Sequence, residues 1–202
     1  MKLYDSAIAP NPRRVRIYLA EKGINVPIEQ VDIAKGVNRQ PAFLAKNPFG
    51  GVPVLELDDG TCIAESIAIC RYFEETNPKP PLFGEGAKER ALVEMWQRRM
   101  ELGLLSLVAG CFQHTSEFFK GRIKQVPDWG ALCKENALAR MQWLDGELAS
   151  RKFIAGDKYT VADITALVAI DFGRASQIRV APEQKNLVRW HQEVSSRPSA
   201  KA

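Results

Sequence analysis

Long apolar runs, histidine and paired cysteines are all scarce in this 202-residue sequence. No uninterrupted apolar stretch reaches the length that a membrane-spanning helix needs, and no apolar signal-peptide core follows the basic start. The two histidines and four cysteines form neither a CxxC motif nor a metal-ligand spacing. We therefore expect no membrane span and no metal site. We also expect a cytoplasmic protein with reduced, mostly buried cysteines, namely Cys62, Cys70, Cys111 and Cys133.

A strong excess of one charge is also absent. Lysine and arginine together number 28 and aspartate and glutamate 24, for a formal net charge of +4. The positive side chains are scattered, apart from Arg13, Arg14 and Arg16, so the sequence has no basic stripe of the kind that binds nucleic acid. The length allows one large domain or two small ones, and both would bury a core.

The stretch from Asn47 to Arg71 carries the strongest local signals. Its apolar run from Val54 to Leu57 and its run from Thr61 to Ala64 read as two strands. Between them, Asp58-Asp59-Gly60 tolerates the positive φ angles of a hairpin turn. Glu65-Ser66 then precedes apolar residues at helical spacing, so this pair is predicted to lie where a helix begins.

Pro53 and Ser66 each have a purely structural interpretation, because proline is tolerated at the first residue of an edge strand and serine commonly caps helices. Taken together they allow a second interpretation. If the Val52-Pro53 bond is cis, Val52 turns its N–H and C=O groups outward, where an extended peptide can pair with them. The free N–H groups at the helix start would receive a carboxylate, so the region would bind a small acidic peptide.

The arrangement of Val52-Pro53 followed by Glu65-Ser66 at a helix start resembles the glutathione-binding half of the glutathione S-transferase superfamily. The length of the chain and the order of its elements also match this family. The resemblance implies that Val52, the residue before the cis-proline, pairs with the cysteinyl part of glutathione. It also implies that Glu65 and Ser66 hold the γ-glutamyl carboxylate.

The first half of the chain reads as a small α/β domain. Lys2–Tyr4 and Val26–Ile33 are predicted strands, and the helix between them starts near Asn11-Pro12 and ends at Gly23. Such a crossover makes the two strands parallel neighbours. With the hairpin and its following helix, the resemblance implies a thioredoxin-like domain of βαβ-ββα order.

A proline-rich run from Asn77 to Pro81 then breaks the helical pattern, so we place the domain boundary there. The predicted domains are residues 1–77 and 86–202, with residues 78–85 as the linker. The second domain is expected to be all-α, with a long bent helix or two helices over residues 86–120 and another helix over 129–150. We expect these helices to turn one apolar side to the core, through Leu92, Met95, Trp96, Met100, Leu104, Leu107 and Val108 in the first, and Leu132, Ala139, Trp143 and Leu144 in the second.

Thr160 and Asp163 match a capping box at the start of a further, apolar helix. In the family this cap recurs in the core helix of the all-α domain. We therefore expect Asp163 to be structural.

The thiol-activating residue is the point at which the sequence departs from the family. Members activate glutathione with a tyrosine, serine or cysteine soon after the first strand, and the best-matching position here is Ala9. Two donors remain in this loop, Asn11, which matches an asparagine of nu-like bacterial transferases, and Ser6. Asn11 before proline is also a good helix N-cap, and both interpretations stay open.

Other parts of the site follow from the resemblance. Asn38, Arg39 and Gln40 lie in the segment that covers the glycine end of glutathione, while Gly51 stands where many members have a lysine or histidine. Phe49 resembles the aromatic key that enters the partner's second domain in some dimeric classes. The acceptor pocket is expected between the domains, with these candidates: Ile8, Leu104, Val108, Cys111, Phe112 and Phe119.

The expected function is transfer of glutathione to hydrophobic electrophiles by a homodimer that needs no cofactor, with glutathione as the co-substrate. One alternative is a main role as a glutathione-dependent peroxidase or disulfide reductase. Another is a non-catalytic member that binds ligands or proteins. Ala9 favours the non-catalytic alternative, and the intact Val52-Pro53 and Glu65-Ser66 set favours the enzyme.

Overall fold

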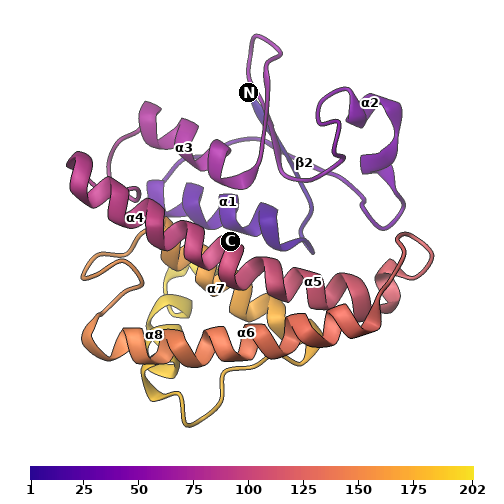
Figure 1. The fold of residues 1–202 in the computed structure, drawn as a ribbon. Coiled ribbons are helices and arrows are strands. Elements are labelled where there is room, and N and C mark those ends of the chain that lie inside the picture. The colour runs from indigo at the N-terminus through magenta and orange to yellow at the C-terminus, as the bar shows by residue number, and fades with distance from the viewer. The chain divides into compact units, whose positions relative to one another are not determined.

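The computed structural model describes all of residues 1–202 and divides them into two units. The first unit comprises Met1–Pro81 with Lys201–Ala202, and the second comprises Leu82–Ala200. Figure 1 shows strands and helices in the first and helices throughout the second. This is the predicted α/β plus all-α class.

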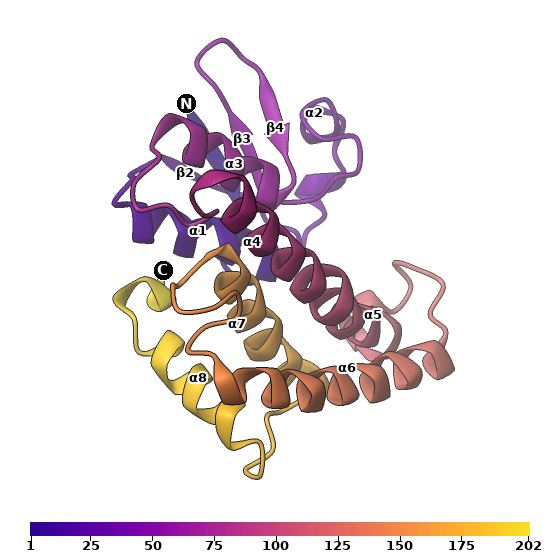
Figure 2. The same ribbon diagram turned by 60° about the vertical axis from the view of Figure 1, so that its left-hand side comes forward.

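A four-stranded mixed sheet forms the centre of the first unit, in the order β2-β1-β3-β4. Strand β1 runs parallel to β2 and antiparallel to β3, and β3 and β4 form the predicted hairpin (Figure 2). Leu3 and Tyr4 of β1 and Val54 and Leu55 of β3 are buried, so the central strands carry the core. The strands are β1 (Lys2–Asp5), β2 (Ile28–Gln30), β3 (Val54–Glu56) and β4 (Cys62–Ala64).

Three helices accompany the sheet: α1 (Pro10–Lys22), α2 (Pro41–Leu44) and α3 (Ser66–Thr76). Helix α1 ends where Gly23 adopts a left-handed conformation, as its sequence predicts. Helices α1 and α3 pack against each other, whereas α2 stands apart from both in the two ribbon views (Figures 1 and 2). The predicted βαβ-ββα order is confirmed.

The C-terminal ends of α1 and α3 are joined by a buried lysine. The Lys22 side chain has no exposed surface, and its Nζ lies 2.5 Å from Glu74 Oε2. The same nitrogen donates to the carbonyl oxygens of Asn77, at 2.7 Å, and Pro80, at 2.6 Å. Because the ammonium group meets three acceptors, it fixes the two helices and the proline-rich segment that follows them.

The second unit contains five α-helices and a π-helical segment, η2, which continues α4 into α5. The predicted long helix is therefore one continuous helical segment, α4-η2-α5, which we call the helix rod. Its hydrogen-bond pattern changes from α-helical to π-helical in η2 and back to α-helical in α5. The elements are α4 (Gly86–Met100), η2 (Glu101–Leu105), α5 (Ser106–Thr115), α6 (Pro127–Glu147), α7 (Val161–Gly173) and α8 (Lys185–Ser195). Short 3₁₀ turns complete the chain: η1 (Val37–Arg39), η3 (Glu117–Phe119), η4 (Leu148–Ser150), η5 (Arg174–Ser176) and η6 (Pro198–Lys201). None of the helices combines the length and the apolar composition that crossing a membrane requires.

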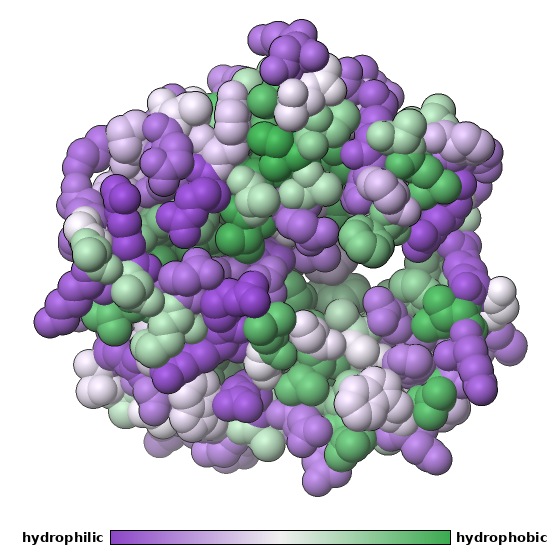
Figure 3. Space-filling model, turned by 45° about the horizontal axis from the view of Figure 1, so that its top comes forward, coloured by the Kyte–Doolittle hydropathy of each residue, from purple (hydrophilic) through white to green (hydrophobic).

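Four apolar residues expected in the core are exposed: Leu92, Met95, Leu132 and Ala139. These predictions were wrong because both helices carry apolar side chains on more than one face. The buried line of α6 instead passes through Cys133, Ala137, Met141 and Leu144. In Figure 3, hydrophobic side chains accordingly form several separate groups on the surface.

Helix α7 is the most deeply buried element of the second unit, with eleven of its 13 residues buried. Its start has the predicted capping box, in which Asp163 accepts hydrogen bonds from the Thr160 N–H and hydroxyl. Asp163 also accepts from the Ile154 N–H, at 2.9 Å, and from Trp190 Nε1, at 2.8 Å. Burial raises the pKa of Asp163 to about 6, against the opposing effect of these four donors.

Candidate functional site

The Val52-Pro53 peptide bond is cis, as the sequence analysis anticipated. The strand ladder begins at the next residue, Val54, which pairs with Tyr4 on one side and Ala64 on the other. The Val52 side chain packs against the buried cluster of Tyr4, Val31, Phe43 and Val54. Its backbone therefore lies at a fixed place just outside the sheet.

Helix α3 begins at Ser66, after the β3–β4 hairpin, and its N-terminal end is unusual. Its N-cap, Glu65, has a φ of 71° and makes no side-chain cap, and no acidic residue lies in the first turn. A non-glycine residue with positive φ is uncommon and costs of order 1–3 kcal/mol. The N–H groups of Ser66, Ile67 and Ala68 have no intrahelical acceptor. The helix start thus offers donors and a positive dipole end to an anion.

Arg14 joins this helix start to the start of α1. Its side chain is buried, with 2% of the residue surface exposed. Its Nη1 donates to Asn11 Oδ1 at 3.1 Å and to Ser66 Oγ at 3.3 Å. Two predicted site residues that are 55 positions apart in the sequence therefore share one buried guanidinium.

The start of α1 corrects one interpretation of Asn11. The N-cap is Ala9, which has no side chain to cap with, and Asn11 is the second residue inside the helix. Asn11 is therefore not the cap that the alternative required. The Ala9 N–H donates to Ser6 O at 3.0 Å, and Pro10 and Pro12 carry no N–H. The Asn11 side chain is exposed, whereas Ser6 is buried.

The segment before Val52 is held by side-chain donors. Asn38 Nδ2 donates to Gly50 O at 2.7 Å, Arg39 Nη1 to Phe49 O at 3.0 Å and Asn47 Nδ2 to the Gly51 carbonyl at 2.9 Å. These three bonds fix a loop on which the Phe49 side chain is 84% exposed.

Gly50 fits this loop because its φ is +63° and a Cβ there would lie 2.8 Å from Asn38 O. Gln40, the third residue predicted to cover the glycine end, is exposed at the N-cap of α2.

The acceptor-pocket candidates fall into both units. Ile8 belongs to the first unit and is 71% exposed. In the second unit Leu104, Val108 and Cys111 are buried in the helix rod. Phe112 and Phe119 meet edge to face, with ring centroids 5.8 Å apart, in an aromatic cluster with Phe118 and Phe172.

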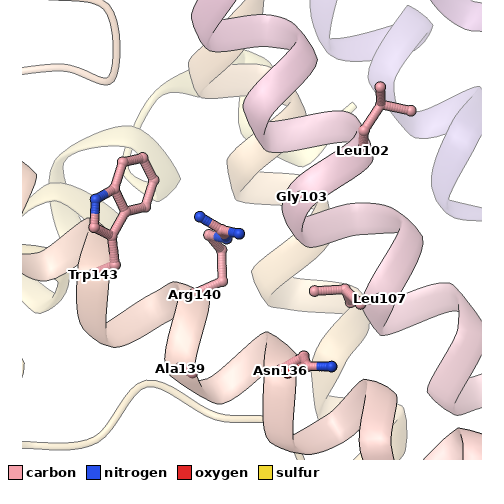
Figure 4. A pocket seen from close by; sticks show the side chains of 7 residues that line it. All are labelled: Leu102, Gly103, Leu107, Asn136, Ala139, Arg140 and Trp143. Carbon is pink, nitrogen blue, oxygen red and sulfur yellow. The ribbon is translucent and has the colours of Figure 1, made fainter.

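A groove of about 510 Å³ lies within the second unit, and none of the predicted site residues lines it. Figure 4 shows Arg140 reaching from α6 toward the helix rod, close to Gly103. The lining residues are Leu102, Gly103, Leu107, Asn136, Ala139, Arg140 and Trp143.

The roles of Arg14 and Asn47 are not predicted by the sequence. In the sequence Arg14 is only one of three neighbouring arginines, and nothing there names its contacts with Asn11 and Ser66. A signal was present, because Arg14 lies three and four residues before Ile17 and Tyr18, on the buried face of α1. No comparable signal distinguished Asn47, whose Oδ1 also accepts from the Phe49 N–H at 3.2 Å.

Two family models match the chain. The glutathione S-transferase N-terminal domain matches residues 8–76, and the glutathione S-transferase C-terminal domain matches residues 132–198.

Curated relatives and solved structures agree with these matches. Glutathione S-transferase 2 of Saccharomyces cerevisiae is 38% identical over 205 residues, covering 100% of this chain and 88% of the relative. The crystal structure of Gtt2 from Saccharomyces cerevisiae has a TM-score of 0.95 at 38% identity and covers 100% of this chain and 99% of its own. A glutathione S-transferase domain-containing protein of Marinobacter aquaeolei has a TM-score of 0.95 at 43% identity, over 98% of this chain and 99% of its own. The chain belongs to the glutathione S-transferase family.

Proposed function

We propose that the protein binds glutathione on its first unit and activates the thiol for attack on hydrophobic electrophiles. The observation that carries this proposal is the start of α3, which has open N–H groups, no acidic residue in its first turn and Ser66 in contact with a buried guanidinium. The γ-glutamyl carboxylate binds there, with Glu65 facing the adjacent ammonium group. The backbone of Val52, which Pro53 holds beside the sheet, pairs with the cysteinyl residue.

Asn11 is the first candidate for thiol activation. Because Arg14 donates to Oδ1, the Asn11 amide directs its NH₂ group elsewhere, and an NH₂ group stabilises a thiolate by donating to it. The Asn11 backbone N–H adds a second donor at the helix start, since its proline neighbours have none. Ser6 remains the second candidate, although its burial makes a direct approach to the sulfur harder.

At the glycine end of glutathione, Arg39 and Gln40 bind the terminal carboxylate. Arg39 uses one donor on the Phe49 carbonyl and has further N–H groups to offer. Asn38 supports the loop, because its NH₂ group donates one hydrogen bond to Gly50 O.

Among the acceptor candidates, Phe112 and Phe119 of the second unit are half-buried and can meet an electrophile, whereas Leu104, Val108 and Cys111 are buried. Ile8 of the first unit is exposed and can also meet an electrophile. Ala9, which provides no hydroxyl or thiol, favours a second candidate function, that of a member that binds ligands with little catalysis. A peroxidase or disulfide-reductase role would use the same activated thiol. The reduced cysteines fit a cytoplasmic setting for any of these roles.

The working form is a homodimer in which Phe49 of one copy enters the second-unit groove of the other. Phe49 is highly exposed on a braced loop, and the groove offers Trp143 and Arg140 to an aromatic ring. Phe49→Ala and Ala139→Arg, which fills the groove, should each shift sedimentation toward the monomer, while Ile123→Ala should not. A dimer unchanged by both variants would exclude this contact.

Retention on immobilised glutathione, followed by an aryl-halide conjugation assay, tests the function directly. Retention with conjugation supports the transferase, and retention without conjugation supports the ligand-binding candidate. Failure to bind glutathione at all would overturn both.

A further inference from the structure

We propose that Arg14 is a positioning residue that orients both ends of the glutathione site, the Asn11 amide at the thiol and the Ser66 hydroxyl at the γ-glutamyl carboxylate. This inference rests on the proposed function. It adds a residue that touches neither part of glutathione and acts through two residues that do.

The first step concerns the Asn11 amide. A guanidinium group has only N–H donors, so the amide atom 3.1 Å from Arg14 Nη1 has to be the acceptor oxygen. The amide NH₂ group is then directed away from Arg14. Without this contact the amide can turn by 180° and present its oxygen, whose negative partial charge would repel a thiolate.

The second step concerns the Ser66 hydroxyl. Its oxygen accepts from Arg14 Nη1 at 3.3 Å, so the hydroxyl hydrogen stays available for another acceptor. A ligand carboxylate at the start of α3 is such an acceptor. Arg14 therefore makes Ser66 a donor toward the carboxylate.

The third step concerns charge and rigidity. Arg14 is 2% exposed and lies on α1, while Ser66 is the first residue of α3. A buried guanidinium interacts with nearby anions more strongly than an exposed one, because little water screens it. Its planar group can serve two acceptors in fixed directions, which the ammonium group of lysine does not reproduce.

The test compares Arg14→Lys and Arg14→Met with Arg98→Met, which removes an exposed arginine from α4. Calorimetry gives the glutathione Kd, and the pH dependence of conjugation gives the thiol pKa. Arg14→Met should weaken glutathione binding about tenfold and raise the kinetic pKa by about one unit. Arg14→Lys keeps the charge, so its Kd should stay within about threefold while its kinetic pKa still rises. Arg98→Met should change neither quantity.

A double variant keeps the test decisive if Arg14→Met does not fold. Because Arg14 acts on the thiol through Asn11, Arg14→Lys should add no further pKa shift in an Asn11→Ala background. An undiminished shift there, or wild-type pKa and Kd values in the folded Arg14 variants, would overturn the positioning role. If Ser66→Ala and Asn11→Ala themselves change nothing, the site assignment of the proposed function has failed instead.

Discussion

Helices α7 and α3 differ in how the polar groups at their N-terminal ends are paired. At α7 the N-cap Thr160 and the neighbouring donors of Ile154 and Trp190 meet the chain's own carboxylate, because Asp163 accepts four hydrogen bonds while fully buried. At α3 no acid lies in the first turn and the N-cap side chain makes no cap. At the α7 start the protein itself supplies the hydrogen-bond partners, whereas at the α3 start the N–H groups are available to a ligand carboxylate.

The backbone of the two N-caps follows this difference. Thr160 adopts an ordinary extended conformation, whereas Glu65 has a φ of 71°. Strain of this kind persists only where the surrounding structure enforces it, and it is common at binding sites. The comparison indicates that α7 is built for stability and α3 for binding.

The largest effect is expected at α7. Asp163→Ala removes the acceptor of the Ile154 and Trp190 donors, and each unsatisfied buried donor costs about 1–3 kcal/mol. Urea denaturation should show a loss of more than about 3 kcal/mol in unfolding free energy. Glutathione affinity of the folded protein should stay unchanged; a variant that loses affinity but keeps its stability would reverse the comparison.

The next effect is expected at α3 and concerns binding. Ser66→Ala should weaken glutathione affinity by about 1.5–3 kcal/mol, the range for a hydrogen bond to a charged group, with a much smaller change in stability. Calorimetry and urea denaturation measure the two quantities. Ser196→Ala, an exposed serine after α8, serves as the matched control.

The pH dependence of stability sharpens the contrast further. The pKa of Asp163 is raised to about 6, so between pH 4 and pH 6 the folded state holds a proton that the unfolded chain has released. The contribution of Asp163 to the unfolding free energy therefore falls as pH rises through this window. The stability difference between the wild type and Asp163→Asn should be about 1 kcal/mol larger at pH 5 than at pH 7. A difference that grows with pH would show that the four donors outweigh burial.

The smallest stability effect is expected when an acidic residue is placed in the first turn of α3. Ala68 is exposed in the first turn, and Ala68→Glu should stabilise the protein by about 0.3–1 kcal/mol through the helix dipole. The same carboxylate should repel that of glutathione and weaken its binding. Ala68→Gln is the neutral control. Equal affinities of the two variants would mean that no ligand carboxylate lies at this helix start.

The sequence predicted those parts of the fold and of the site that depend on local signals. The hairpin turn at Asp58–Gly60, the helix start at Ser66 and the cap at Thr160 each rest on a few adjacent residues, and the structure has all three. The order of elements followed, since a crossover helix dictates parallel neighbours for the first two strands.

The remaining features of the fold and the site depend on contacts between residues that are far apart in the sequence. Arg14 meets Ser66 across 52 positions, and Lys22 meets Glu74 across the same distance, so no local pattern names either partner. Leu132 and Ala139 show the related limit for packing. Apolar residues occur around much of α6, and only the packed neighbours decide which face is buried.

A thermodynamic cycle can test whether the start of α3 binds the γ-glutamyl carboxylate through Ser66. Calorimetry would compare glutathione with an analogue that lacks only this carboxylate, on the wild type and on Ser66→Ala. We expect the wild type to lose about 1.5–3 kcal/mol of affinity for the analogue and the variant to lose clearly less, because the two partners of one interaction are not additive. Equal losses on both proteins would show that Ser66 and this carboxylate do not meet, and would contradict a glutathione site at this helix start.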